Sequence, residues 1–139
     1  MTMKLPDEVR EQLAAAALDA RQWAYVPYSN YRVGAALLTA SGRIYDGVNV
    51  ENAAYPSSIC AERVAVFKAV SAGEREFTAL AVATDNGGTP CGACRQVLAE
   101  FGTDTIVYLF DGEGNLTLET TVAALLPHNF GPQSLSPRS

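Results

Sequence analysis

The sequence lacks most of what a nucleic-acid binder, a disulfide-bonded secreted protein or a membrane protein would need. Its 139 residues include 10 basic and 15 acidic side chains, a net charge of −5, without a basic cluster to neutralise phosphates. Cysteine occurs three times, an odd number that does not suit a disulfide framework. No run reaches the roughly 18 apolar residues of a membrane-spanning helix, and residues 1–7 do not resemble a signal peptide. We therefore expect a cytoplasmic protein that acts on a small molecule and binds neither nucleic acid nor membrane.

The composition is typical of one folded domain. Hydrophobic residues make up 48% of the chain and charged residues 18%, which favours a folded over a disordered protein. The length is sufficient for a hydrophobic core, and neither an internal repeat nor a linker divides the chain. We expect a single domain over residues 1–139, with the Pro- and Ser-rich residues 131–139 as a partly flexible tail.

The order of the expected helices and strands indicates an α/β fold. Strands 33–39 and 43–50 are joined by a short turn and predict an antiparallel hairpin. Strands and helices then alternate over residues 43–110, which predicts parallel pairing through crossover helices. We expect a three-layer α/β/α fold with a mixed five-stranded sheet. The other expected strands are 78–84, 105–110 and 116–119, and the expected helices are 9–25, 60–71, 92–101 and 121–126.

The three cysteines have the pattern of a metal site that lacks one ligand. Cys91 and Cys94 form a C-x-x-C motif, and Cys60 lies upstream, followed after one residue by Glu62. Three thiolates are one ligand short of a closed tetrahedral zinc site, and a catalytic zinc keeps the fourth position for water. A glutamate beside that water could carry its protons. The pattern predicts one zinc ion per chain and a hydrolytic deaminase in which Glu62 is not a ligand.

The expected helices would direct two N-termini toward the metal. Cys60 precedes helix 60–71 and Cys91 precedes helix 92–101, and the partial positive charge of helix N-termini favours thiolates. Residues two apart on a regular helix do not share a face. Cys60 must therefore lie at the N-cap, with Glu62 in the first turn, if both are to face the metal.

Several other residues could contribute to a metal site or have a different role. His128, the only histidine, could close a structural Cys₃His site in a binding module, although a surface position is favoured because it lies far from the cysteines in sequence. Arg63 and Arg95 could donate hydrogen bonds to the thiolate sulfurs, and Arg63 could equally form a surface ion pair. Gly92 is expected to keep the space between the two cysteines of the C-x-x-C motif clear.

Five segments resemble the cytidine deaminases that act on free nucleosides. They agree in order and spacing over about residues 23–135, nearly the whole chain. The resemblance implies a zinc-dependent hydrolase that converts cytidine and 2′-deoxycytidine to uridine and 2′-deoxyuridine in pyrimidine salvage, with Glu62 as the proton carrier. The segments are Pro27-Tyr28-Ser29, Val33-Gly34-Ala35-Ala36-Leu37-Leu38, Asn49-Val50-Glu51-Asn52-Ala53-Ala54-Tyr55, Ile59-Cys60-Ala61-Glu62-Arg63 and Cys91-Gly92-Ala93-Cys94-Arg95-Gln96.

The resemblance also implies which residues contact the nucleoside. Asn49 and Glu51 match the asparagine and glutamate that bind the ribose. Tyr31 stands where the family usually has phenylalanine, so the ring that packs on the pyrimidine is retained while its hydroxyl needs a partner. Ala61 belongs to the same substrate-binding set. Deamination of a related aminopyrimidine, such as an aminoacyl-nucleoside antibiotic, is an alternative that the retained Glu51 disfavours.

Two aromatic residues link the site to quaternary structure. Tyr55 and Phe130 match positions that reach the site of a neighbouring subunit, and the resemblance therefore implies a homotetramer with active sites completed across subunits. Taken as residues alone, both could equally be core aromatics of their own subunit.

Overall fold

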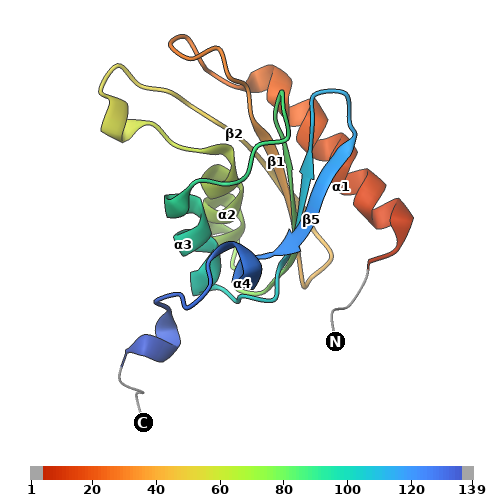
Figure 1. Cartoon of the computed structure of the whole chain (residues 1–139), viewed down its shortest axis with the longest axis vertical. Coiled ribbons are helices and arrows are strands. Elements are labelled where there is room, and N and C mark those ends of the chain that lie inside the picture. Colours follow the sequence, from red (N-terminus) through yellow and green to blue (C-terminus); the bar gives the residue numbers. More distant parts are fainter. Residues whose placement is uncertain (1–4, 136–139) are drawn as a thin grey trace.

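The computed structural model describes residues 5–135 and arranges them in three layers, with a sheet between helices (Figure 1). The sheet has the strand order β2-β1-β3-β4-β5, with β3 and β4 parallel and every other neighbouring pair antiparallel. The expected α/β fold with a mixed five-stranded sheet is confirmed. The strands are β1 (Gly34–Thr39), β2 (Ile44–Val48), β3 (Phe77–Ala83), β4 (Ile106–Phe110) and β5 (Leu116–Thr121).

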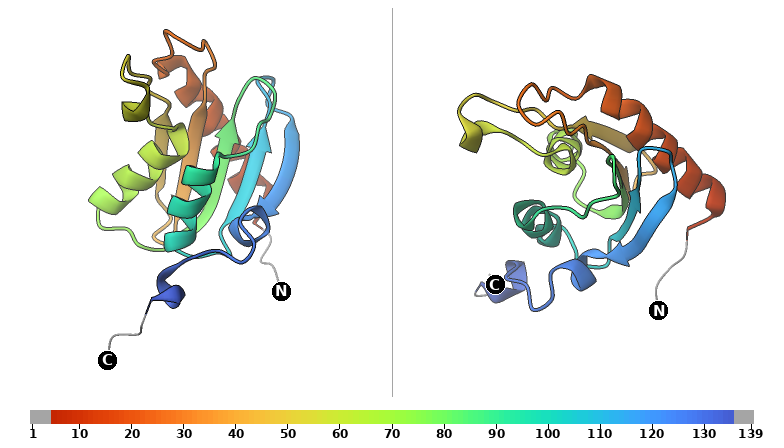
Figure 2. Two further views of the ribbon diagram at one scale, coloured as in Figure 1. Left: turned by 60° about the vertical axis from the view of Figure 1, so that its left-hand side comes forward. Right: turned by 45° about the horizontal axis from the view of Figure 1, so that its top comes forward.

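Helices cover both faces of this sheet. α1 (Asp7–Ala20) packs on one face, and α2 (Ala61–Ser71) lies with α3 (Gly92–Glu100) on the other (Figure 2). A short α4 (Val122–Leu125) follows β5. Among residues 5–135, every helix is too short or too polar to cross a membrane.

Two expectations about these elements need correction. The strand expected at 43–50 does not pair with the strand at 78–84, because β1 lies between β2 and β3 and pairs antiparallel with both. The first helix ends at Ala20 instead of residue 25, since the chain passes through a 3₁₀ turn and then extends so that Tyr25 can bridge to Val50. Of the expected tail, residues 132–134 form a 3₁₀ turn, and residues 136–139 lie outside the described range.

Two hydrophobic cores form because alternate side chains of β3 and β4 point to opposite faces of the sheet. On the face of α2 and α3 these strands present larger aliphatic side chains, and on the face of α1 strand β3 presents only alanine. The small alanines allow α1 to approach the sheet closely. The first set is Leu80, Val82, Val107 and Leu109, and the second is Ala79, Ala81, Ala83, Ile106, Tyr108 and Phe110.

Two glycines allow helices to touch the sheet backbone. A Cβ atom at Gly34 would lie 2.0 Å from the carbonyl oxygen of Ala17 in α1. A Cβ atom at Gly47 would lie 2.4 Å from the carbonyl oxygen of Ala61, the first residue of α2. Any larger residue at these positions would force the helix away from the sheet. Gly47 therefore sets where the N-terminus of α2 lies, and with it the position of Cys60.

Candidate active site

Three cysteines from the starts of two helices meet in one cluster. Cys60 is the N-cap of α2 and Cys91 the N-cap of α3, both with extended backbone, while Cys94 lies in the first turn of α3. The Sγ atom of Cys91 lies 3.7 Å from that of Cys60 and 3.4 Å from that of Cys94, and all three lie within 4.8 Å of one another. Sulfurs bound to one tetrahedral zinc at about 2.3 Å would be about 3.8 Å apart. The sulfurs are therefore spaced to share one ion.

Glu62 lies in the first turn of α2, directly beside this cluster. Because Cys60 takes the N-cap position, as expected, both residues line the same cavity despite being two apart in sequence. The Glu62 residue is only 5% exposed. Burial raises the pKa of its carboxyl group to about 7, and the negative charge of Cys60 adds to this effect. A carboxyl group in such a position can both accept and release a proton near neutral pH.

The ionisation of the thiols is linked. Hydrogen bonding from the Cys94 thiol, followed by donation from Arg63, lowers the pKa of Cys60 to about 5. The same interaction with Cys60, together with burial and the charge of Glu62, raises the pKa of Cys94. The thiolates and the carboxylate therefore cannot all be charged without a compensating cation. This donor set fits zinc, which binds thiolates and would offset their charge.

The two arginines expected beside the sulfurs have different partners. Arg63 donates from Nη2 to the Sγ atom of Cys60 at 3.3 Å, and this bond raises the pKa of its guanidinium group. The Nε atom of Arg63 is buried and has no acceptor among residues 5–135. The expectation for Arg95 is wrong, because its guanidinium donates to three oxygens that join the loop before α3 to the end of α4. These are the Pro90 carbonyl at 2.7 Å, the Leu125 carbonyl at 2.8 Å and Thr89 Oγ1 at 3.0 Å.

Two further expectations can be compared with the structure. His128 lies in an exposed turn with φ 55°, and the metal-ligand cluster found in the described part of the chain contains cysteines only. The chain therefore does not assemble a Cys₃His site. A Cβ atom at Gly92 would meet no atom within 4 Å, so Gly92 does not clear space between its neighbouring cysteines.

A cavity of about 500 Å³ opens beside the cysteines. Cys60, Ala61, Glu62, Arg63 and Cys91 form one wall, at the starts of α2 and α3. The opposite walls are formed by the expected substrate-binding residues Tyr31, Asn49, Glu51 and Tyr55. A larger cavity of about 680 Å³ lies elsewhere, beside the start of β3, and neither cysteine nor histidine lines it. The cysteine cavity is therefore the candidate active site, because thiols and a buried carboxyl group line it.

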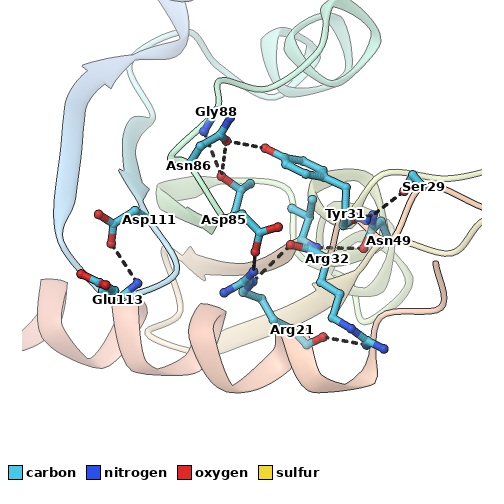
Figure 3. A network of polar contacts seen from close by, with 12 residues as sticks. Arg21, Ser29, Tyr31, Arg32, Asn49, Asp85, Asn86, Gly88, Asp111 and Glu113 are labelled. Atoms are coloured by element: carbon cyan, nitrogen blue, oxygen red, sulfur yellow. Dashed lines mark hydrogen bonds and ion pairs between the residues drawn. The ribbon is translucent and has the colours of Figure 1, made fainter. Parts of the chain in front are cut away.

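Asn49 fixes the backbone around Tyr31. Its Nδ2 atom donates to the Tyr31 carbonyl at 2.8 Å, and its Oδ1 atom accepts from the Val33 amide at 3.0 Å (Figure 3). The amide group of Asn49 has a second N–H, which these two bonds do not use. Asn49 thus holds the start of β1 in place while it retains a donor at the edge of the cavity.

Glu51 fixes the neighbouring segment in a similar way. Its Oε1 atom accepts from the backbone amides of Tyr28 at 3.0 Å and Ser29 at 3.1 Å, and its Oε2 atom accepts from the Ser29 hydroxyl. The Ser29 hydroxyl is the largest of several hydrogen-bonding causes that lower the pKa of Glu51. Glu51 is therefore held as an anion that can accept further hydrogen bonds.

The three aromatic residues of the expected site lie in different settings. Tyr31 lines the cavity, and its hydroxyl donates to Asn86 Oδ1 at 2.8 Å (Figure 3). Tyr55 is 71% exposed, and its ring packs in an edge arrangement with that of Tyr28, with ring centroids 6.0 Å apart. Phe130 is 60% exposed and does not line the cavity of its own chain. Neither Tyr55 nor Phe130 is therefore a core residue.

The sequence did not reveal every residue that shapes this site. The loop between β3 and α3 contains no sequence motif that would indicate a contact between Asn86 and Tyr31. Ser29 belongs to a segment that resembles the family, but its contact with Glu51 has no signature in the sequence. Both contacts join residues more than 20 positions apart, so local sequence patterns contain no signal for them.

Comparisons with known proteins agree with this geometry. The sequence model of the family described as "Cytidine and deoxycytidylate deaminase zinc-binding region" matches residues 7–110, a range that includes all three cysteines. The chain is 55% identical over 129 residues to a cytidine deaminase of Sporosarcina psychrophila, covering 91% of this chain and 94% of that protein. It is 48% identical over 130 residues to a cytidine deaminase of Halalkalibacterium halodurans, covering 91% and 98% respectively.

A solved structure gives the same result for the fold. The crystal structure of a cytidine deaminase from Burkholderia pseudomallei superimposes with a TM-score of 0.82 and 47% sequence identity. The match covers 86% of this chain and 98% of that one. The likeness therefore extends over nearly the whole of the known structure.

Proposed function

Because the chain belongs to the cytidine and deoxycytidylate deaminase family, a family of zinc-dependent hydrolases, we propose that it hydrolyses the C4 amino group of cytidine and 2′-deoxycytidine. The products are uridine or 2′-deoxyuridine and ammonia, as in pyrimidine salvage. The observation that carries this proposal is a cluster of three thiols and one buried carboxyl group at the wall of a cavity.

Cys60, Cys91 and Cys94 would hold the zinc ion. When bound, zinc supplies a Lewis acid that lowers the pKa of a water molecule toward neutrality and so provides the nucleophile. The N-termini of α2 and α3 point their partial positive charge at Cys60 and Cys91, and Arg63 donates to Cys60. These interactions would withdraw negative charge from the sulfurs.

Glu62 would carry the protons of the reaction. It would accept one proton from the attacking water and deliver it to N3 of the pyrimidine. It would then take the second proton from the hydroxyl group formed at C4 and deliver it to the amine as ammonia departs. Its burial beside Cys60 supports this role, because a carboxyl group held out of water can take up and release protons near neutral pH.

The opposite walls of the cavity would bind the nucleoside. The Tyr31 ring would pack on the pyrimidine, and Asn49 and Glu51 would bind the ribose hydroxyls through the unused N–H of Asn49 and the anionic oxygens of Glu51. Ala61 is fully buried and has no polar side chain, so it would contribute backbone groups only.

The site would be completed in a homotetramer. Tyr55 and Phe130 are exposed, and Gln96 Nε2 in α3 holds the carbonyl of Phe130 at 2.7 Å, close in sequence to Cys94. An exposed ring held in this way is suited to enter a neighbouring subunit. The buried Nε atom of Arg63 also needs an acceptor, which a neighbouring chain or water would supply.

We further propose that residues 1–139 form a single domain that works in the cytoplasm. One sheet joins both hydrophobic cores of residues 5–135. The three cysteines are free thiols, which is the state that metal binding requires and that a reducing compartment maintains.

The loss of ultraviolet absorbance of cytidine tests the proposed reaction. Purified protein is incubated with cytidine or 2′-deoxycytidine after zinc loading, after treatment with a chelator, and after readdition of zinc. We expect conversion in the first and third samples only. A zinc-loaded protein that binds one ion per chain yet leaves both nucleosides unchanged would overturn the proposal.

A further inference from the structure

The hydroxyl of Tyr31 has a partner on the loop that leads to a metal ligand. It donates to Asn86 Oδ1 at 2.8 Å and so joins the segment before β1 to the loop between β3 and Cys91 (Figure 3). A phenylalanine would present the same apolar face to the cavity without this bond. The hydroxyl therefore adds a connection that stacking on a base does not require.

The loop is built to receive this hydroxyl. Thr84 Oγ1 accepts from the Gly88 amide at 2.9 Å, which folds the loop back on the end of β3. A Cβ atom at Gly88 would lie 2.9 Å from the Tyr31 hydroxyl oxygen, so only glycine allows this approach without a shift. On the other side of the loop, the carboxylate of Asp85 pairs with Arg21 (Figure 3).

The backbone of Tyr31 is tied to the opposite side of the cavity. Its carbonyl accepts from Asn49, and its amide donates to Ser29 Oγ at 3.0 Å, whose hydroxyl donates to Glu51. Tyr31 thus connects the two proposed ribose-binding residues with the loop that ends at Cys91. A change at Asn86 would be transmitted to the ring through its hydroxyl.

We propose that Asn86 is a positioning residue, which fixes the tilt of the Tyr31 ring and its separation from the loop before Cys91. The inference rests on the proposed function, because it identifies what holds the ring against the base. Asn86 does not touch the reacting atoms, so it governs substrate binding more than the chemical step.

A double-mutant cycle with Tyr31→Phe and Asn86→Ala tests this role. Both single variants remove the bond between Tyr31 and Asn86, and Asn86→Ala also removes the longer bond that Thr84 Oγ1 donates to Asn86 Oδ1 at 3.4 Å. Each should raise the KM for cytidine about two- to tenfold, as expected for the net contribution of one hydrogen bond. In each variant kcat stays within about twofold. The double variant is no worse than the more impaired single variant. Asn86→Asp, which keeps an acceptor oxygen, recovers most of the loss.

Tyr45→Phe is the matched control. It removes another tyrosine hydroxyl, which donates to Glu74 at 3.1 Å, and Tyr45 does not line the cysteine cavity. We expect an unchanged KM. The proposal is overturned if Asn86→Ala leaves the KM unchanged, or if the effects of Tyr31→Phe and Asn86→Ala multiply in the double variant.

Hydrogen exchange of the Gly88 amide provides a readout that does not depend on activity. Both single variants should accelerate this exchange by a similar factor, about two- to tenfold, with Tyr45→Phe unchanged. A wild-type chain that fails to deaminate cytidine would overturn the proposed function alone. Unaltered Gly88 exchange in both single variants would overturn the positioning role alone.

Discussion

Glu62 and Glu74 lie near opposite ends of α2, and their surroundings differ in every respect that sets the pKa of an acid. Glu62, in the first turn, is buried beside Cys60, and burial raises its pKa to about 7. Glu74, just beyond the last turn, accepts hydrogen bonds from the hydroxyls of Ser41 at 2.6 Å and Tyr45 at 3.1 Å. These bonds, led by that of Ser41, lower the pKa of Glu74.

The difference separates a carboxyl group suited to chemistry from one suited to structure. Donors around Glu74 stabilise its anion and join the β1–β2 turn to the connection between α2 and β3. Glu62 is held away from water at some cost in stability, because its charged form is poorly solvated. Such a cost is typical of functional sites. A substitution at Glu62, at the cavity end of α2, should therefore lower activity. A substitution at Glu74, at the end of α2 near the β1–β2 turn (the hairpin end), should lower stability only.

Glu62→Gln gives the largest effect we expect. The amide cannot accept and release the protons of the reaction, and general acid–base groups contribute about 10²–10⁴-fold to rate. We expect at least that loss in kcat for cytidine, with zinc content and thermal stability retained. Steady-state kinetics and metal analysis measure both.

Glu74→Gln is the matched control at the other end of the same helix. It makes the same chemical change at a carboxylate outside the cavity, so kcat and KM should stay at the wild-type values. If the two glutamine variants lost activity equally, or if Glu62→Gln kept normal turnover, the contrast between the two ends of α2 would be refuted.

Glu51→Ala should give the second-largest effect, and it tests the proposed contact between Glu51 and the ribose. Loss of hydrogen bonds from two sugar hydroxyls to an anion is expected to lower kcat/KM for cytidine roughly 10–100-fold. Free cytosine, which has no sugar, should be a poor substrate for both the wild-type and the Glu51→Ala protein. The substitution should lower kcat/KM for cytosine only slightly. Glu51→Gln keeps acceptor oxygen for Tyr28 and Ser29, so it separates substrate binding from support of that segment. Equal losses for cytidine and cytosine would exclude the sugar contact.

Phe130→Ala should have a smaller effect, because the Phe130 ring would enter the cavity of a neighbouring subunit. We expect a several-fold rise in the KM for cytidine, because an aromatic contact contributes about 0.5–1.5 kcal/mol beyond its buried area. Sedimentation of the wild-type protein at micromolar concentration should give a tetramer. Leu118→Ala serves as the control. It truncates a different exposed apolar side chain, which lies on β5, and it should leave the KM unchanged. A fully active monomer would show that the neighbouring subunit is not required.

Much of the fold could be predicted because its signals are local. The short turn between residues 39 and 43 and the alternation of strands and helices indicated the sheet, and the Cys60–Glu62 spacing required an N-cap that the structure contains. The position of β1 between β2 and β3 could not be predicted in this way. Which strands pair depends on the packing of the whole sheet, where the central alanines of β1 are buried under helices on both faces.

The candidate site shows the same division between local and distant signals. The residue types and spacing of Cys60, Cys91 and Cys94 were sufficient to predict a cluster, and the structure brings their sulfurs together. The partners of Arg95 were not predictable, because a guanidinium group can reach any of several oxygens and the end of α4 lies far away in sequence. The contact between Tyr31 and Asn86 escaped prediction for the same reason.

Thermal unfolding of Glu74→Gln as a function of pH shows the smallest effect and tests the hairpin end directly. The pKa of Glu74 is lower in the folded than in the unfolded chain, so its hydrogen bonds stabilise the fold above the unfolded pKa of about 4.3. This contribution disappears as the pH falls through the folded pKa. We expect Tm to fall by about 1–3 °C at pH 7, because the group is partly accessible to solvent. The difference from wild type should shrink as the pH falls below the unfolded pKa and vanish only below the lowered folded pKa. Acid releases zinc from the variant and from the wild type alike, so the difference in Tm between them at each pH does not contain the effect of zinc loss. Glu100→Gln removes an exposed carboxylate at the end of α3, far from this turn in sequence, and its Tm at pH 7 should stay close to wild type. A Tm difference for Glu74→Gln that persisted unchanged in acid would show that its anion does not stabilise the turn.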